Sequence, residues 1–160
     1  MSPDRIGRPR RPDQPYESHQ LHQPHQPYQY VVLRCVPRPD REEFLNVGVV
    51  LHSPAAEFLG AAWRLDRQRL AAFAPELDQE SVRSALEAVD LICAGDAHAG
   101  FGAGRRATAY GVRLLGDDQS TRFGLLKAPR STVLQPGPVH GGVTEDPAAE
   151  LQRLLAALVS

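Results

Sequence analysis

The chain has 160 residues, of which 42% are hydrophobic and 23% charged, and its formal net charge is −1. This is the length of one domain, with enough apolar side chains to bury a core without disulfides or metals. The near-neutral charge gives no general attraction to nucleic acid or to anionic membranes, so nonspecific binding to either is not expected as a main role.

Residues 1–27 contain six prolines and few large apolar side chains. Such a segment cannot bury enough surface to offset the entropy lost on ordering, so we predict a disordered leader rich in Pro, His and Arg. His19, His22 and His25 recur there every third residue, which would align them along a polyproline II segment and permit weak binding of a transition metal. A solvated low-complexity stretch accounts for the same composition, and we favour it.

A single α+β domain is predicted over residues 28–160. Three strands are expected over residues 28–36, 44–51 and 58–65, because these segments are rich in β-branched and aromatic residues or alternate in polarity. They predict an antiparallel three-stranded meander with one apolar face. That face should carry Leu45, Val47, Val49 and Leu51 from the second strand, and Leu59, Ala61, Trp63 and Leu65 from the third.

Helices are predicted to cover this sheet. Asp66 can begin a short helix that ends before Pro75, and Asp78 can begin a longer one that ends at Gly95. The longer helix places Val82, Leu86, Val89 and Cys93 at helical spacing. The clearest helix is the C-terminal one, with Asp146 as N-cap, Pro147 at the first position, and a stripe of Leu151, Leu154, Leu155 and Leu158 that should dock on the sheet.

The segment between these helices gives weaker signals. Several glycines predict a mobile loop near residues 95–106, and residues 107–115 are compatible with a strand or a helix, the strand being favoured. Ser120 or Thr121 can cap a short helix that carries Phe123, Leu125 and Leu126. Residues 131–135 read as a strand ended by Pro136, so one or two later strands should join the meander.

The two cysteines, Cys35 and Cys93, are each set among apolar residues, where reduced cysteines act as small hydrophobic side chains. We therefore expect no disulfide. No apolar run approaches the ~18 residues of a transmembrane helix, and the leader lacks the apolar stretch of a signal peptide. These features predict a cytoplasmic protein with no membrane attachment.

The densest polar cluster is the segment Arg41-Glu-Glu-Phe-Leu-Asn-Val-Gly48, which runs from a turn into a strand. Glu42 and Glu43 are adjacent, so in an extended chain they point to opposite faces and cannot act as a paired acid and base. The structural interpretation is that one of these carboxylates pairs with Arg34 or Arg41. In the same interpretation, Asn46 forms hydrogen bonds with backbone groups, and Gly48 allows a neighbouring backbone to come close.

A second cluster, Lys127-Ala-Pro-Arg130-Ser, could hold a phosphate or an acidic partner surface through its cationic side chains. A solvated loop is the favoured alternative, because the segment lacks a glycine-rich phosphate cradle. The sequence from Gly100 to Arg106 fails the spacing of the dinucleotide fingerprint, and no Walker A, zinc-protease or nucleophile-elbow motif is present. His52 and His98 are isolated, so neither a metal site nor a cofactor is expected.

Three segments together resemble a bacterial family known as domain of unknown function 3037: Tyr28-Gln-Tyr-Val-Val-Leu-Arg-Cys-Val-Pro, Arg41-Glu-Glu-Phe-Leu-Asn-Val-Gly-Val-Val-Leu and Lys127-Ala-Pro-Arg-Ser. The resemblance extends through the helix start at Thr144-Glu-Asp-Pro and spans roughly residues 28 to 159. It implies no catalytic activity, because none is established for the family. Members look like companions of HipA-like serine/threonine kinases, whose genes often adjoin theirs. Arg41, Glu43, Asn46 and Arg130 match polar positions of the family, without an assigned role.

These observations lead to two hypotheses. The first is an interaction or regulatory module that binds a HipA-like kinase, with Arg34, Arg41 and Arg130 as candidate contacts because Arg is favoured at interface hot spots. The second is a small enzyme or a nucleotide- or phosphate-binding domain, with Glu43 as acid or base and Arg41, Asn46 and Arg130 orienting an anionic substrate. RNA binding through Tyr28 and Tyr30 is disfavoured, because such a platform needs three or more exposed aromatic side chains and Phe44 and Trp63 are expected to be buried.

Overall fold

The computed structural model describes residues 25–95 and 118–160. Most of the expected leader, the glycine-rich loop beyond Gly95 and the segment 107–115 lie outside the described residues. The elements follow the chain in the order β1 (Gln26–Cys35), η1 (Pro39–Arg41), β2 (Leu45–Ser53), β3 (Phe58–Trp63), α1 (Arg67–Phe73), α2 (Gln79–Ala94), α3 (Gln119–Lys127), β4 (Leu134–Pro136), β5 (His140–Thr144) and α4 (Pro147–Leu158).

The sheet has five antiparallel strands in the order β3-β2-β1-β4, with β5 also paired to β1. The predicted three-stranded meander is therefore confirmed as β1, β2 and β3. On the other edge of β1, β4 pairs with residues 33–35 and β5 with residues 26–30, so two short strands share one edge. The first strand begins at Gln26, two residues before the expected start, because Pro27 lies opposite Val143 of β5.

A β-bulge interrupts the pairing of β1 with β2. Leu33 lies opposite Gly48, whereas Arg34 lies opposite Asn46, which leaves Val47 as an extra residue on β2. An extra residue in one strand shifts the alternation of its side chains between the two faces. A Cβ atom on Gly48 would lie 2.8 Å from Cβ of Trp63, so the expected close backbone approach at Gly48 is confirmed.

This bulge corrects the prediction that Leu45, Val47, Val49 and Leu51 share one face. Leu45 and Val47 pack in the core cluster beneath α2 and α3, whereas Val49 and Leu51 pack in the cluster beneath α4. Strict alternation fails at the extra residue, so Leu45 and Val47 lie on the opposite face of the sheet from Val49 and Leu51.

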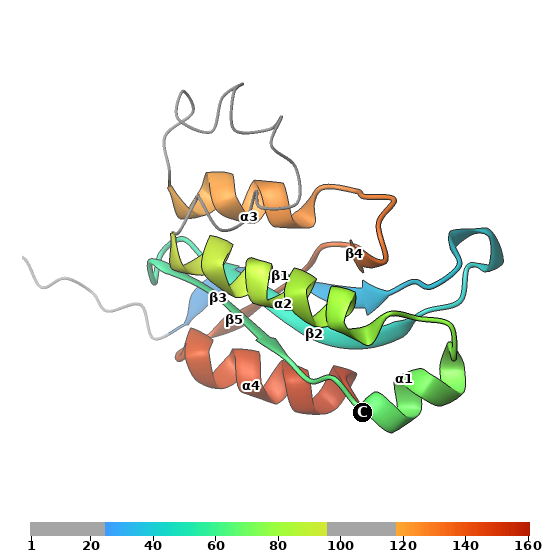
Figure 1. Cartoon of the computed structure of the whole chain (residues 1–160). Helices are drawn as coiled ribbons and strands as arrows, with labels where there is room; N and C mark the ends of the chain where they lie inside the picture. Colours follow the sequence, from blue (N-terminus) through green and yellow to red (C-terminus); the bar gives the residue numbers. More distant parts are fainter. Residues whose placement is uncertain (1–24, 96–117) are drawn as a thin grey trace, which may run out of the picture.

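Both faces of the sheet are apolar, which corrects the expectation of one apolar face. In Figure 1, α2 and α3 lie on one side of the sheet and α4 lies on the other. The third strand behaves as predicted, since its alternating set packs beneath α2 and α3. The result is an α+β fold with three layers, in which the central sheet is the shared core. Each face has its own cluster, built respectively around Val31, Val50, Leu86 and Phe123 and around Val49, Leu51, Leu151 and Leu154.

Side-chain caps set the helix starts. Asp66, Asp78 and Asp146 each accept a hydrogen bond from a backbone N–H in the first turn of their helix, as predicted. Gly95 ends α2 with a φ of 88°, a left-handed conformation that glycine adopts without steric cost. The expected cap at Ser120 or Thr121 is wrong, because Asp118 accepts the hydrogen bond from the N–H of Thr121 and α3 therefore begins earlier.

The C-terminal helix docks on the sheet as predicted. Leu151, Leu154 and Leu155 are buried, and Leu158 packs against the same cluster from a half-buried position. The strand predicted over residues 131–135 is present as β4, which begins at Leu134 and ends with Pro136 itself. β5 lies in a segment for which the sequence predicts no strand. Among the described residues, no helix has the length and apolar character needed to cross a lipid bilayer.

Candidate functional site

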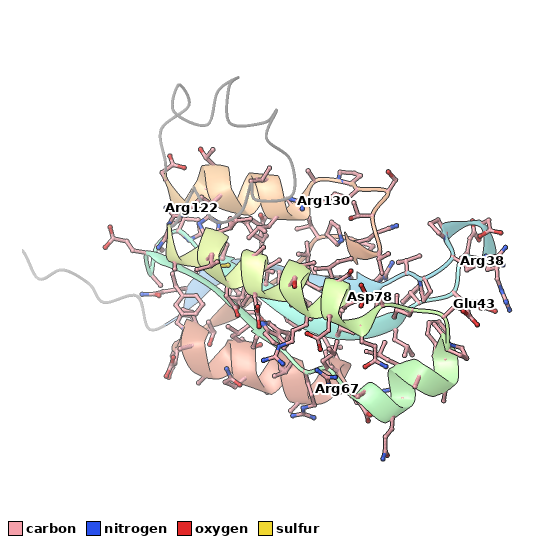
Figure 2. The ribbon with its side chains drawn as sticks, in the orientation of Figure 1. Arg38, Glu43, Arg67, Asp78, Arg122 and Arg130 are labelled. Atoms are coloured by element: carbon pink, nitrogen blue, oxygen red, sulfur yellow. The ribbon has the colours of Figure 1, made fainter. Side chains whose placement is uncertain are left out.

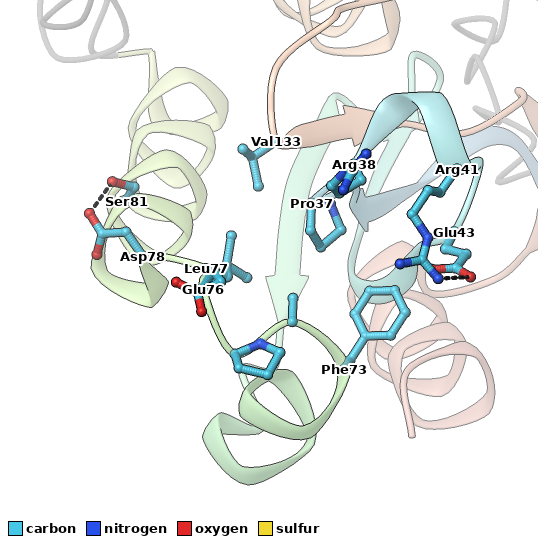
Figure 3. A pocket seen from close by; sticks show the side chains of 12 residues that line it. Pro37, Arg38, Arg41, Glu43, Phe73, Glu76, Leu77, Asp78, Ser81 and Val133 are labelled. Carbon is cyan, nitrogen blue, oxygen red and sulfur yellow. Dashed lines mark hydrogen bonds and ion pairs between the residues drawn. The ribbon is translucent and has the colours of Figure 1, made fainter.

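A cleft of about 510 Å³ opens at the end of the β1–β2 hairpin. One wall is the hairpin loop from Pro37 to Glu43, and the other is the link between α1 and α2, from Phe73 to Asp78. Val133, just before β4, closes the space between them, as Figure 3 shows. Segments far apart in the sequence thus converge on one concave surface, which is the usual form of a binding site.

The interior of this cleft is largely apolar and its margin is charged. Apolar surface comes from Pro37, Phe73, Ala74, Pro75, Leu77 and Val133. Val133 is 37% exposed, a high value for a large hydrophobic residue that lines a concave surface. The arrangement offers burial to an apolar group and polar contacts around it.

Arginines on the hairpin wall already have carboxylate partners. Arg38 makes two hydrogen bonds to Asp40, of 3.1 and 2.7 Å, and this bidentate pairing raises the pKa of Arg38 and lowers that of Asp40. Arg41 lies 3.0 Å from Glu43, an ion pair drawn in Figure 3. These pairs hold the guanidinium groups in place beside the cleft, although exposed pairs of this kind add little stability.

Acidic groups line the opposite wall. Asp78 accepts a 2.6 Å hydrogen bond from the hydroxyl of Ser81 and another from the backbone N–H of Glu80, and these bonds lower its pKa. Glu76 lies beside it on the α1–α2 link. The cleft therefore has two arginine–carboxylate pairs on the hairpin wall and the carboxylates of Glu76 and Asp78 on the other wall.

The chemistry available in the cleft favours binding over proton transfer. Its shifted groups are Arg38, with a raised pKa, and Asp78, with a lowered pKa, so both are held more firmly in their charged forms. A general acid or base works best with a pKa close to the working pH, and these shifts move both groups away from it. Ser81 has a carboxylate partner but no imidazole beside it among the residues that line the cleft.

The five predicted site residues do not converge. Arg41 and Glu43 lie together in the cleft, and their ion pair confirms the structural interpretation of this hairpin. Asn46 donates a 3.1 Å hydrogen bond to the backbone carbonyl of Leu158, at the end of α4. Arg130, which follows the end of α3, donates a hydrogen bond to the backbone carbonyl of Leu125 within that helix. Figure 2 shows Arg130 well apart from Glu43.

Arg34 lies on β1 and packs on an aromatic ring. Its guanidinium carbon is 4.1 Å from the centroid of Phe44, and its Nε atom is buried with no hydrogen-bond partner among the described residues. Gly137 leaves room for this guanidinium, since a Cβ atom there would lie 3.0 Å from it. Phe44 is 42% exposed, so the expectation that it is buried is wrong; its ring lies under a cation near the surface. Trp63 is partly buried, and its indole N–H donates to Asp90.

No pattern in the sequence points to the α1–α2 wall of the cleft. Asp78 fits a helix cap and Pro75 fits a helix stop, but neither pattern indicates what the link packs against. Val133 lies inside the strand predicted over residues 131–135. An unusually exposed valine next to a proline-rich hairpin is the one feature that could have pointed to the cleft, and exposure is known only from the fold.

Other reactive groups are isolated. Burial raises the pKa of the Cys35 thiol to about 11 and that of Cys93 to about 12, and neither forms a disulfide. His52 is buried against Phe123, and burial together with Lys127 lowers its pKa. Within residues 25–95 and 118–160, no group of three or more His, Cys, Asp or Glu side chains is placed to hold a metal ion.

Comparison with known proteins gives one result. The model of a family described as "Protein of unknown function (DUF3037)" matches residues 30–159, which covers all the described elements except the first residues of β1. No curated protein and no solved structure matches the chain.

Proposed function

The chain belongs to the DUF3037 family of proteins of unknown function, and from that premise we propose that it is a protein-interaction module whose cleft binds a segment of a partner protein. The observation that carries this proposal is the composition of the cleft, with its apolar interior and with its arginines already paired to carboxylates. Such a surface suits an apolar side chain flanked by polar peptide groups.

We further propose that the partner is a HipA-like serine/threonine kinase. The support for this step is the resemblance of the hairpin and of the Lys127–Ser131 segment to a family whose genes often adjoin those of such kinases. A partner segment with one apolar anchor and a positive charge beside it would complement the apolar interior and the carboxylates of Glu76 and Asp78 on the α1–α2 wall.

The second candidate, an enzyme or phosphate-binding domain, has less support. It needs Glu43, Arg41, Asn46 and Arg130 within reach of one bound group, and only the first two line the cleft. Asn46 and Arg130 each donate to a backbone carbonyl elsewhere in the fold.

Co-expression with a HipA-like kinase encoded by a neighbouring gene, followed by size-exclusion chromatography, tests the proposal. The substitution Val133→Glu places a charge against the apolar interior of the cleft and should weaken the complex about tenfold or more, because a buried charge without a partner is costly. Val139→Glu is the matched control, since Val139 is exposed to a similar degree, 44%, and does not line the cleft.

Each result has a defined meaning. Co-elution of the wild type and of Val139→Glu, together with loss of co-elution for Val133→Glu, supports binding in the cleft. If wild-type chain and kinase are both folded and elute separately at micromolar concentration, the kinase proposal fails. If both glutamate variants bind as the wild type does, the partner uses another surface.

A further inference from the structure

The outer edge of β3 is the least protected edge of the sheet. β3 pairs only with β2 and ends the strand order, so its other side has no neighbouring strand within the described residues. In Figure 1 it runs along the near side of the sheet, with α2 covering one face and α4 the other. Its six residues, Phe-Leu-Gly-Ala-Ala-Trp, include no charged side chain and no proline.

The register shows which backbone groups face outward. Arg64 donates its N–H to the carbonyl of Val47, so it belongs to a hydrogen-bonded pair of the β2–β3 ladder. Hydrogen-bonded pairs alternate with non-hydrogen-bonded pairs along an antiparallel ladder. The backbone groups of Phe58, Gly60 and Ala62 therefore also form hydrogen bonds with β2. The backbone N–H and C=O groups of Leu59, Ala61 and Trp63 therefore point to the outer edge. In the described part of the chain, these groups have no hydrogen-bond partner.

The opposite edge of the sheet is protected in the ways that proteins commonly use. There β4 has three residues and ends in Pro136, and β5 is a separate strand of five residues that begins with a histidine and two glycines. Short strands, proline and interruptions all discourage pairing with another chain. β3 has neither a proline nor an interruption, and an apolar edge without such protection favours the addition of a further strand.

We propose that β3 pairs with β3 of a second copy of this chain, antiparallel and centred on Ala61, to form a continuous sheet across a two-fold dimer. This register places the three outward-facing residues of each copy opposite one another, so that Ala61 meets Ala61 and Leu59 meets Trp63. Six backbone hydrogen bonds can form in this arrangement. A two-fold interface requires such self-complementarity.

The side chains also fit this pairing. Leu59 of one copy lies across from Trp63 of the other, an aliphatic and aromatic pair of the kind that stabilises sheets. Phe58 lies across from Arg64, whose exposed side chain can cover the ring and gain a cation–π contact. At the centre, Gly60 lies across from Ala62, and the ring of Phe58 folds over Gly60, 2.8 Å from the place that a Cβ atom would take. These pairings favour a second copy over an unrelated strand, and the proposal is independent of the cleft.

Analytical ultracentrifugation of the full chain over about 1 μM to about 1 mM tests the dimer, since weak interfaces associate in that range. Hydrogen exchange with residue resolution should then show protection that grows with concentration at the amides of Leu59, Ala61 and Trp63. The amides of Gly60 and Ala62 should be protected at every concentration, because they bond to β2.

Two substitutions locate the interface. Ala61→Pro removes an outward donor from each copy and should weaken dimerisation about tenfold or more, while the folded monomer persists, because proline is tolerated on edge strands where the N–H faces outward. Arg64→Glu removes the cation from the Phe58 ring and should weaken dimerisation less. The matched control is Arg67→Glu, the same charge reversal on α1, which should leave the dimer unchanged.

Several outcomes overturn the proposal. One is a monomer across the whole concentration range. Another is a dimer in which the amides of Leu59, Ala61 and Trp63 gain no protection, which would place the contact elsewhere. If those amides are protected only when the neighbouring kinase is added, the edge accepts a strand from that partner and the pairing of two copies is wrong. If Ala61→Pro unfolds the chain, Arg64→Glu and Arg67→Glu are compared instead. Equal dimerisation of these two variants overturns the proposal.

Discussion

The two faces of the sheet are covered in different ways. On one face, α2 and α3 pack over a broad apolar cluster that includes Phe123, Leu86 and Val50. On the other, α4 alone covers Val49 and Leu51. A hydrogen-bonded polar cluster supports this second face, since the hydroxyl of Tyr28 donates to Glu150 at 2.5 Å and Arg153 donates two bonds to the same carboxylate. A single helix thus combines a leucine stripe with a specific polar anchor.

The two faces should therefore contribute to stability in different ways. The face beneath α2 and α3 depends mainly on apolar volume, so cavities there should be costly. The face beneath α4 also depends on charge, so it should respond more strongly to acid. Substitutions and pH changes on each face test that contrast.

Replacing Phe123 by Ala should have the largest effect. The ring is 2% exposed and packs against His52 beneath α3, so its removal leaves a cavity in the broad cluster. We expect a loss of about 3–5 kcal/mol in the free energy of unfolding. Urea denaturation followed by circular dichroism measures it, and a loss below about 1 kcal/mol would show that α3 contributes little to this face.

Replacing Leu154 by Ala should cost about 2–4 kcal/mol, because the side chain is 5% exposed in the smaller cluster. Since α4 covers its face alone, its amides should lose hydrogen-exchange protection more than those of α2 do. Equal loss of protection in the two helices would mean that the faces unfold together and that the contrast has no consequence for local stability.

Removing the Tyr28 hydroxyl, as in Tyr28→Phe, should cost about 1.5–3 kcal/mol at neutral pH, since the hydroxyl bonds to a charged acceptor in a half-buried site. The pKa of Glu150 is lowered to about 2 from an ordinary 4.5, chiefly by the hydrogen bond from Arg153, with a further bond from Tyr28. Stability from this carboxylate is therefore present above about pH 4.5 and is lost as the pH falls towards 2.

The contribution of Glu150 is measured as the change in the free energy of unfolding between about pH 4.5 and pH 2. The control is Glu150→Gln, which should remove most of the stability loss in that range. Alkaline pH provides a second check. Burial and the bond to Glu150 raise the pKa of Tyr28 to about 12, so the wild type should lose stability as the pH rises from about 10 towards 12, and Tyr28→Phe should lose less. Identical profiles for wild type and variant would contradict the proposed anchor.

Titration of His52 should give the smallest effect, on the opposite face. Burial and the nearby Lys127 lower its pKa below the ordinary 6.5, so the folded state favours the neutral ring. Its contribution is present above about pH 6.5 and is lost as the pH falls below that value, a window higher than that of Glu150. NMR titration of the imidazole measures the shift directly, and a pKa at or above 6.5 would remove this distinction between the faces.

Much of the secondary structure could be predicted from the sequence because its signals are local. Aspartate caps marked three of the four α-helices, Gly95 marked the end of α2, and the leucine stripe placed α4 against the sheet. The alternation in β3 also predicted the face that it buries. Each of these signals acts within one or two turns of helix or along one strand, so neighbouring residues suffice to determine it.

The tertiary structure decided what depends on distant partners. The extra residue at Val47 is defined only by pairing with β1, and it reversed the faces assigned to Leu45 and Val47 relative to Val49 and Leu51. The cleft likewise requires the hairpin, the α1–α2 link and Val133 to meet. Contacts of this kind are absent from any short window of sequence, because they are fixed by the packing of whole elements. Local patterns therefore determined most of the elements of this protein, whereas long-range packing determined its surfaces and the short edge strand β5.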